Sequence, residues 1–429
     1  MTPAIQDKIS TDQSLVDKCS ESSAFWGNAD ASEISGTLTR IFKKLMPFPK
    51  IDENLPKPKA YVGIDLGERK WIVALLAPSA SNPSLQTFIG DSKRHDFAKW
   101  LKEKARRLGI EDLREITVCF EVGRCGAWPM KFVNSLGVPC VIMSSDVLYE
   151  GRRKAKSDRL DARRLVERLR RFYRGEGESR HVHVPAPDEI VEARSSARLR
   201  DVAVKQRTSA IASFKSLLST YTEVPSRLDM DTVVPSGLRD CLGRPLPPKA
   251  VATLEYHLAR YKECRDKVRE LDREARLESA EARRKFADGG TLPENDAVMA
   301  KLGNVVAVGP HTSRCLAREL FWKKFGNVRQ VGAATGLVDV PDSSGTVSRS
   351  EGISRCANGR IRKLAVELAW LWVRLQPDSE ITRWFARRVM ASRAGRKTAI
   401  VAVARKLVVA LWKYVEFGTV PKGARLRTA

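Results

Sequence analysis

The sequence predicts an α/β domain with a mixed sheet, followed by a region built almost entirely of helices. Residues 59–175 alternate short apolar runs, rich in β-branched residues, with stretches at helical spacing. Residues 186–285 show two long helical patterns and no strand pattern, and residues 296–429 are again mainly helical. The fold class is therefore α/β joined to all-α.

The α/β domain is expected to run strand, strand, strand, helix, strand, helix, strand, helix. Residues 60–66 (AYVGIDL) and 71–77 (WIVALLA) flank a charged turn and predict a hairpin. Such an order gives a mixed sheet with helices packed on it. The other elements are expected at residues 85–89, 97–108, 115–122, 126–136, 138–143 and 158–172.

The helical region divides into a long pair and a C-terminal group. Residues 190–220 and 250–285 are separated by five prolines and predict an antiparallel pair that packs on another helix or subunit. Residues 340–359, rich in Ser, Gly, Asp and Asn, predict a long functional loop. Helices are expected around it at residues 297–301, 312–321, 327–336, 360–375, 380–390 and 397–417.

These patterns divide the chain into four segments. Residues 1–58 are rich in Ser, Asp and Glu and predict a flexible N-terminal extension. The α/β domain occupies residues 59–185, a helical coiled-coil segment residues 186–290, and a mainly helical domain residues 291–429.

The composition favours a nucleic-acid partner. Lys and Arg total 76 against 51 Asp and Glu, a net charge of +25, which argues against a small neutral metabolite as the only ligand. The eight cysteines include no Cys-x-x-Cys pair, which argues against a zinc or iron–sulfur site. Because no signal peptide or membrane-spanning run is visible, we expect a cytoplasmic protein without membrane contact.

Four carboxylates are candidates for a metal site. Asp65 lies near the end of the first strand and Glu121 near the end of the fourth, and Asp158 and Asp161 share one face of the basic helix. If those two strands are neighbours, the four can converge, and Mg²⁺ or Mn²⁺ would relieve their repulsion. Taken singly, Asp65 can cap a turn, Glu121 can be solvated, and the two aspartates can form ion pairs with nearby arginines.

Basic residues surround the two aspartates. Residues 151–175 contain 11 Lys and Arg but only 3 acids. A solvated helix face explains such a run, and so does phosphate positioning beside a metal site. The candidates for nucleic-acid contact are Lys156, Arg159, Arg163, Arg164 and Arg168, together with Arg355 and Arg362 near the later loop.

Ser344, in the run Ser343-Ser344-Gly345, is a candidate nucleophile. A serine hydroxyl can attack phosphorus when it is deprotonated or polarised by a metal. Loops are rich in serine, however, and no histidine lies nearby in the sequence to act as a base. Residues 302–309 resemble a helix–hairpin–helix turn, whose N–H groups can hold a phosphate, and a plain helix–helix turn explains them equally well.

Several of these motifs together resemble a known family. They are Gly63-Ile64-Asp65, Phe120-Glu121, residues 156–162 (KSDRLDA), Ser344-Gly345 and residues 353–359 (ISRCANG). In this order they resemble the DEDD-type insertion-sequence transposases, which are bridge-RNA-guided serine recombinases. The resemblance covers about residues 59–420.

The resemblance implies a ribonuclease-H-like, RuvC-like sheet domain, a coiled coil and a C-terminal transposase domain. It implies that Asp65, Glu121, Asp158 and Asp161 form a metal-binding tetrad and that Ser344 forms a phosphoserine link to DNA. The implied partners are donor and target DNA, a structured guide RNA that pairs with both, and further copies of the chain in a dimer or tetramer. The implied location is the nucleoid of a bacterial cell.

The chain departs from the family pattern at four positions. Ala307 stands where a Gly-x-Gly turn usually has its first glycine, Ser157 replaces the usual Thr, and Arg355 replaces the usual Lys. Ser343 directly precedes Ser344 and competes with it for the role of nucleophile. None of these departures removes a carboxylate or the Ser-Gly pair.

Three other functions stay open. The first is a metal-dependent endonuclease of the Holliday-junction type that uses water and forms no covalent intermediate. The second is an actin-like ATPase or sugar kinase, suggested by residues 63–67 (GIDLG), although the only later Gly-Gly pair is Gly289-Gly290, outside the sheet domain. The third is a non-catalytic RNA-binding protein.

Overall fold

The computed structural model describes residues 57–77, 80–123, 125–144, 157–176, 182–344, 347–354, 357–391 and 395–427. The N-terminal extension predicted for residues 1–58 lies almost wholly outside the described residues. Lys156 and Arg355 also lie outside them. No helix of the described chain is long and apolar enough to cross a membrane.

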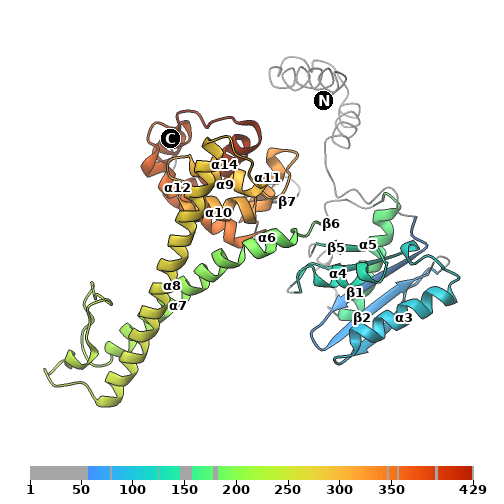
Figure 1. Ribbon diagram of the computed structural model, residues 1–429, viewed down its shortest axis with the longest axis horizontal. Helices are drawn as coiled ribbons and strands as arrows, with labels where there is room; N and C mark the ends of the chain where they lie inside the picture. The colour runs from blue at the N-terminus through green and yellow to red at the C-terminus, as the bar shows by residue number, and fades with distance from the viewer. Residues whose placement is uncertain are drawn as a thin grey trace. The chain divides into compact units, whose positions relative to one another are not determined.

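A six-stranded mixed sheet forms the first part of the described chain (Figure 1). Its order is β3-β2-β1-β4-β5-β6, with β1 parallel to β4 and antiparallel to β2. The predicted element order is confirmed, and so is the condition that the first and fourth strands are neighbours. The strands are β1 (Ala60–Leu66), β2 (Lys70–Leu76), β3 (Ser84–Ile89), β4 (Ile116–Glu121), β5 (Cys140–Met143) and β6 (Val182–His183).

Helices cover both faces of the sheet because its strands carry apolar residues on both sides. Trp71 and Val73 of β2 belong to the core on one face, where Trp71 meets Phe97 edge to face at 6.0 Å between ring centroids. Ile72 and Ala74 point to the other face. The first face is covered by α3 (Lys93–Arg107) and α4 (Trp128–Ser135), and the second by α5 (Asp158–Tyr173).

The contact between α5 and β1 is made backbone to backbone at Gly63. A Cβ at this position would lie 2.7 Å from the carbonyl oxygen of Ala162 and 2.7 Å from the amide nitrogen of Val166. On β4, the thiol of Cys119 donates a hydrogen bond of 3.4 Å to the carbonyl oxygen of Leu165. Only glycine at position 63 permits α5 to pack this closely.

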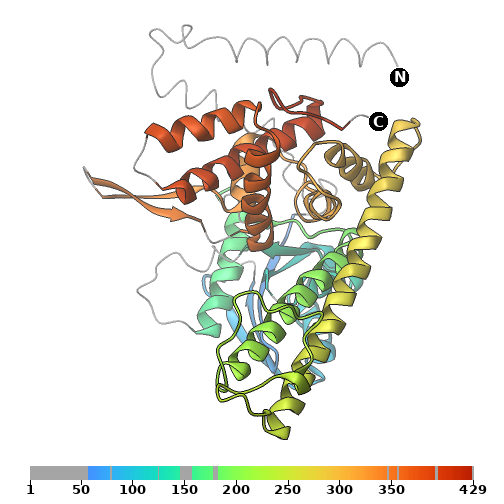
Figure 2. The same cartoon turned by 90° about the vertical axis from the view of Figure 1, so that its left-hand side faces the viewer.

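Two long antiparallel helices, called the arm below, form the middle of the chain (Figures 1 and 2). They are α7 (Ser195–Leu218) and α8 (Pro248–Ala287), preceded by the short α6 (Asp188–Ala193). Arg200 of α7 and Asp272 of α8 form an ion pair of 2.6 Å across the arm. At the far end of the arm, Phe214 and Leu254 are fully buried in a small apolar cluster. The two predicted long helices are confirmed.

The C-terminal part is a helical body with a large apolar core. Trp372 is fully buried there, and its indole N–H donates a 3.0 Å hydrogen bond to the hydroxyl of Ser379. The predicted helix positions are confirmed within a few residues. The helices are α9 (Glu294–Gly303), α10 (Pro310–Glu319), α11 (Val328–Thr335), α12 (Gly359–Leu375), α13 (Glu380–Ala391) and α14 (Arg396–Phe417).

The prediction of a loop over residues 340–359 is wrong for most of that segment. The strands β7 (Asp339–Ser344) and β8 (Val347–Ile353) form a two-stranded antiparallel hairpin, called the serine hairpin below. The polar composition of these strands concealed them, because their sequence lacks the apolar alternation by which a strand with one buried face is recognised.

The turn between α9 and α10 is present as predicted, and it is strained at Ala307. This residue has a φ of 81°, the left-handed region that favours glycine. Hydrogen bonds from the C-terminal segment hold the turn: the Arg427 guanidinium donates to the carbonyl oxygens of Val305 at 3.2 Å and Val308 at 3.1 Å. The buried Gln376 amide donates to the Val306 carbonyl oxygen at 2.8 Å. The departure at residue 307 is therefore tolerated because the surrounding bonds fix the turn.

Replacing Gly63 by alanine is expected to destabilise the sheet domain by about 2–4 kcal/mol, since the added methyl has no space between β1 and α5. The measurement is thermal and urea unfolding. Gly237→Ala is the control, because a Cβ there meets nothing within 4 Å. Equal stability of the two variants would contradict the close packing of α5 on β1.

Candidate active site and nucleic-acid interface

The sheet topology brings Asp65 and Glu121 to the same edge. The parallel register pairs Ile64 of β1 with Phe120 of β4, and each carboxylate is the next residue along its strand. Because carboxyl ends of adjacent parallel strands meet at one edge, the two acids are neighbours in the sheet. Both make interactions within the chain.

The first turn of α5 brings the other two carboxylates to this region. Ser157 is the N-cap, and its hydroxyl accepts a hydrogen bond from the Leu160 amide at 3.4 Å. The contact of α5 with β1 at Gly63 lies one helical turn further on. Because Asp158 contacts Lys70, which lies beside the end of β1, the first turn of α5 lies toward the carboxyl end of β1. We call the edge that carries the four acids the acid edge.

Basic side chains already contact both aspartates. Asp158 forms an ion pair of 2.7 Å with Lys70 at the start of β2. Asp161 is buried and lies 3.4 Å from the Arg164 guanidinium. Both aspartates therefore form ion pairs, although Asp158 pairs with a lysine rather than an arginine and Asp161 is buried rather than solvated.

The acid edge offers the oxygen ligands that Mg²⁺ and Mn²⁺ prefer. Two strand ends and one helix start carry the four carboxylates. In the part of the chain that the structure describes, no group of three or more His, Cys, Asp or Glu side chains could hold a metal as placed. In the described structure Asp158 is instead paired with Lys70.

The basic residues of α5 do not share one environment. Arg159 and Arg163 are exposed, whereas Arg164 and Arg168 are half-buried and make contacts within the chain. The opposite side of α5 buries Leu165 among its sheet contacts. Arg159 and Arg163 are therefore the members of this set that are open to a nucleic acid.

The serine hairpin places Ser344 at its closed end. Ser344 is the last residue of β7 and pairs with Val347, and Ser343 pairs with Ser348. At the other end of the hairpin, the Ser354 amide donates a 2.8 Å hydrogen bond to the carbonyl oxygen of Val338.

The start of α12 holds the base of the serine hairpin. The Arg362 guanidinium is half-buried and donates a 2.9 Å hydrogen bond to the Ser354 carbonyl oxygen. Asn358 caps α12, accepting hydrogen bonds from the amides of Arg360 at 3.1 Å and Ile361 at 3.3 Å. Arg362, predicted to bind nucleic acid, thus has an internal contact.

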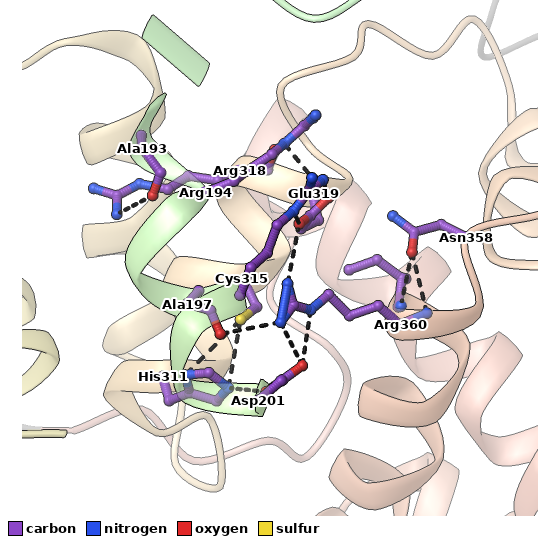
Figure 3. Close-up of polar contacts among 12 residues, drawn as sticks. Ala193, Arg194, Ala197, Asp201, His311, Cys315, Arg318, Glu319, Asn358 and Arg360 are labelled. Atoms are coloured by element: carbon purple, nitrogen blue, oxygen red, sulfur yellow. Dashed lines mark hydrogen bonds and ion pairs between the residues drawn. The ribbon is translucent and has the colours of Figure 1, made fainter. Parts of the chain in front are cut away.

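Arg360 connects α12 to the arm and to α10 (Figure 3). Its guanidinium donates hydrogen bonds to the Asp201 carboxylate at 2.9 Å and to the Ala197 carbonyl oxygen at 3.0 Å, both in α7. It also lies 3.4 Å from the Glu319 carboxylate at the end of α10.

Glu319 is the carboxylate shared by this network. Its side chain is only 3% exposed, and it contacts Arg198 at 2.9 Å and Arg194 at 3.4 Å. Burial raises its pKa, but the hydrogen bond from Arg198 and the nearby guanidinium charges outweigh burial and lower the pKa. Sequence reasoning missed Glu319 and Arg360, because no spacing pattern reveals pairings with α7 that lie more than a hundred positions away in the sequence.

Known proteins resemble this chain over most of its length. The sequence profile described as "Transposase IS116/IS110/IS902 family" matches residues 300–382, which contain the serine hairpin, Glu319 and Arg360. "Putative transposase y4rJ" of Sinorhizobium fredii is 31% identical over 383 residues, covering 86% of this chain and 94% of that protein. "Putative transposase y4qE" of the same organism is 26% identical, covering 82% and 88%. "Transposase for insertion sequence element IS1328" of Yersinia enterocolitica is 23% identical, covering 68% and 80%.

Removing the Glu319 carboxylate is expected to destabilise the protein by about 3–5 kcal/mol, because three arginines lose their shared counter-charge. Since the folded-state pKa is lowered, the stabilisation is present above the ordinary Glu pKa and is lost as the pH falls through the lowered value. Urea unfolding of the unaltered protein and of Glu319→Ala, from pH 7 to pH 3, measures the loss of stability and its dependence on pH. Glu263→Ala, whose side chain is 67% exposed, is the control and should change stability by less than about 1 kcal/mol. An equally small change in Glu319→Ala would contradict the role of the network.

Proposed function

This chain belongs to the IS116/IS110/IS902 family of insertion-sequence transposases, and on that premise we propose that Ser344 cuts and rejoins DNA through a covalent phosphoserine bond. The observation that carries this proposal is the place of Ser344 at the closed end of a hairpin whose base is held by Arg362. A residue at such a tip can approach a phosphodiester without disturbing a core.

The proposed reaction conserves the number of phosphate ester bonds. The Ser344 hydroxyl oxygen attacks a DNA phosphorus, the bond from phosphorus to one deoxyribose oxygen breaks, and the displaced oxygen takes a proton. A hydroxyl of another DNA strand then attacks the phosphoserine, and the serine oxygen leaves with a proton. Because each step exchanges one ester for another, rejoining needs no ATP.

We propose that Asp65, Glu121, Asp158 and Asp161 hold a divalent cation in a RuvC-like, ribonuclease-H-like domain. What supports this is the adjacency of β1 and β4 together with the packing of α5 on Gly63. Such an ion supplies positive charge against the charge that develops on the phosphate oxygens. The chain's own part would be to position the four carboxylates, of which Asp158 contacts Lys70 and Asp161 contacts Arg164.

The same proposal includes a guide RNA and an oligomeric state. A structured guide RNA would pair with donor and target DNA and so supply sequence recognition, and the chain would act as a dimer or tetramer. The exposed Arg159 and Arg163 beside the acid edge, with Lys156 and Arg355, would contact phosphates. The four-segment division at residues 58, 185 and 290 is part of this proposal.

Ser344→Ala is expected to keep DNA binding and to lose both the covalent adduct and recombination, at least about a thousandfold. Trapped protein–DNA adducts on a denaturing gel and a recombination assay are the two measurements. Ser343→Ala is the matched control and should retain substantial activity, since neighbouring strand positions face opposite sides of a hairpin. Normal recombination by both variants would overturn the serine mechanism. Metal-dependent cutting that survives in Ser344→Ala without an adduct would instead favour the endonuclease.

Asp158→Asn is expected to abolish strand exchange while the fold stays intact, because the amide keeps the shape but loses the charge that a cation requires. EDTA should abolish the activity of the unaltered protein, and added Mg²⁺ or Mn²⁺ should restore it. The control is Asp188→Asn, an exposed aspartate outside the acid edge. Unaltered rates in EDTA would refute the metal site.

A further inference from the structure

A groove lies on the helical body between α13 and α14, far along the chain from the predicted basic residues of α5. Its volume is about 650 Å³. Apolar side chains form much of its lining, among them Val328, Ile381 and Val409. The groove lies entirely within the C-terminal part of the chain.

The rim of this groove is strongly basic. The charged residues that line the groove are five cations and one acid, Glu380. All five cations are exposed, and none forms an ion pair with a carboxylate in the described part of the chain. Since exposed cations without counter-charges attract a polyanion, the groove is suited to phosphates. The five are Arg387, Arg405, Lys406, Lys413 and Lys422.

The spacing of the cations suits a continuous nucleic-acid backbone. Lys406 and Lys413 are seven residues apart on α14, which corresponds to about 10.5 Å along the helix axis. That rise is about three steps of 3.4 Å along one DNA strand. Arg387 projects from α13, so both walls of the groove contribute charge.

The aromatic residue in the groove argues for a duplex backbone rather than for unpaired bases. Single-stranded nucleic acids are usually bound by stacking bases on open aromatic faces. The Trp384 ring is half-buried, and the Lys406 ammonium lies 4.7 Å from its centroid. With one face of the ring covered by a cation, the groove presents charge where a base would otherwise stack.

We propose that this groove, lined by α13 and α14, binds the phosphodiester backbone of the duplex DNA on which the transposase acts. The proposal rests on the family's activity on DNA, and it does not depend on the serine mechanism or on the acid edge. It adds an interface to the residues of α5 and of the serine hairpin.

The test is a triple variant, Arg387→Ala with Arg405→Ala and Lys413→Ala, in the full chain. The matched control is Lys99→Ala with Lys102→Ala and Arg106→Ala, which removes the same charge from exposed positions of α3. Affinity for a 40-base-pair duplex is measured by fluorescence anisotropy from about 50 to 300 mM salt. A duplex RNA hairpin provides the second arm, and thermal unfolding reports the fold of each variant.

The groove variant should bind duplex DNA at least tenfold more weakly than the unaltered protein. Its slope of log K against log salt should become shallower by about 2.7, because each phosphate that a cation no longer neutralises reduces the slope by about 0.9. The control variant should change the slope by less than about 1.

Three outcomes would overturn the proposal. Equal weakening in the two variants would do so, because net charge alone would then explain binding. Weakening confined to RNA would do so in favour of an RNA-binding groove. If the triple variant fails to fold, Lys413→Glu alone should still weaken DNA binding, and unchanged binding by that variant would be the third such outcome.

The groove proposal and the serine mechanism can fail independently of each other. A groove variant that binds DNA like the unaltered protein refutes the groove alone, while adduct formation through Ser344 can still be present. Conversely, weakened binding with a normal fold supports the groove even if Ser344→Ala proves active.

Discussion

The arrangement of the sheet domain depends on the close approach of α5 to β1 at Gly63. Two backbone atoms of α5 lie only 2.7 Å from where a Cβ would stand, so the helix packs directly against the backbone of the strand. The helix then fixes where its first turn begins, with Ser157 as N-cap and Asp158 and Asp161 directly after it. Because Asp65 is two residues beyond Gly63 on the same strand, one glycine determines the spacing between strand acids and helix acids. A carboxylate set built in this way tolerates little movement of α5.

A second constraint joins the serine hairpin to the arm. Arg360 and Arg362 lie two residues apart in the first turn of α12, yet they contact different elements. Arg362 donates to the carbonyl oxygen of Ser354 at the base of the hairpin, whereas Arg360 donates to α7 and faces Glu319. The same helical turn therefore sets the base of the hairpin and its position relative to the arm. Glu319 matters because it is the buried counter-charge that allows guanidinium groups from α7 and α12 to approach one another.

Local patterning in the sequence predicted most of the fold. Short continuous apolar runs located β1, β2 and β4, and helical spacing located α7, α8 and the C-terminal helices within a few residues. The strands of the serine hairpin were missed because their residues are polar and carry no burial signal. The two-residue β6 was missed because it is too short for any periodicity. Both failures concern elements whose sequence lacks an apolar periodicity.

The candidate site was predictable only in part, for the same reason. Acids at strand ends and on one helix face follow from spacing, so their edge could be inferred once β1 and β4 were neighbours. The ion pair between Lys70 and Asp158 could not be inferred, because it joins residues in contact only after folding. Arg362 was expected to meet nucleic acid but instead contacts Ser354. A guanidinium is equally suited to a phosphate and to a carbonyl oxygen, and sequence alone does not distinguish the two.

The net charge consequently does not show which surfaces of this protein can bind nucleic acid. Part of the arginine surplus lies inside the helical body: Arg314 and Arg318 are almost fully buried and contact Glu278. These guanidinium groups hold α10 against the arm and have little exposed surface for a phosphate. A surface for phosphates must instead be made of exposed cations whose counter-charges are absent within the described chain. Arg405 and Lys413 on α14 meet that condition and line a groove, whereas Arg164 on α5 does not meet it. The distinction between internal and outward-facing arginines, rather than the total of +25, therefore decides which surfaces can contact DNA.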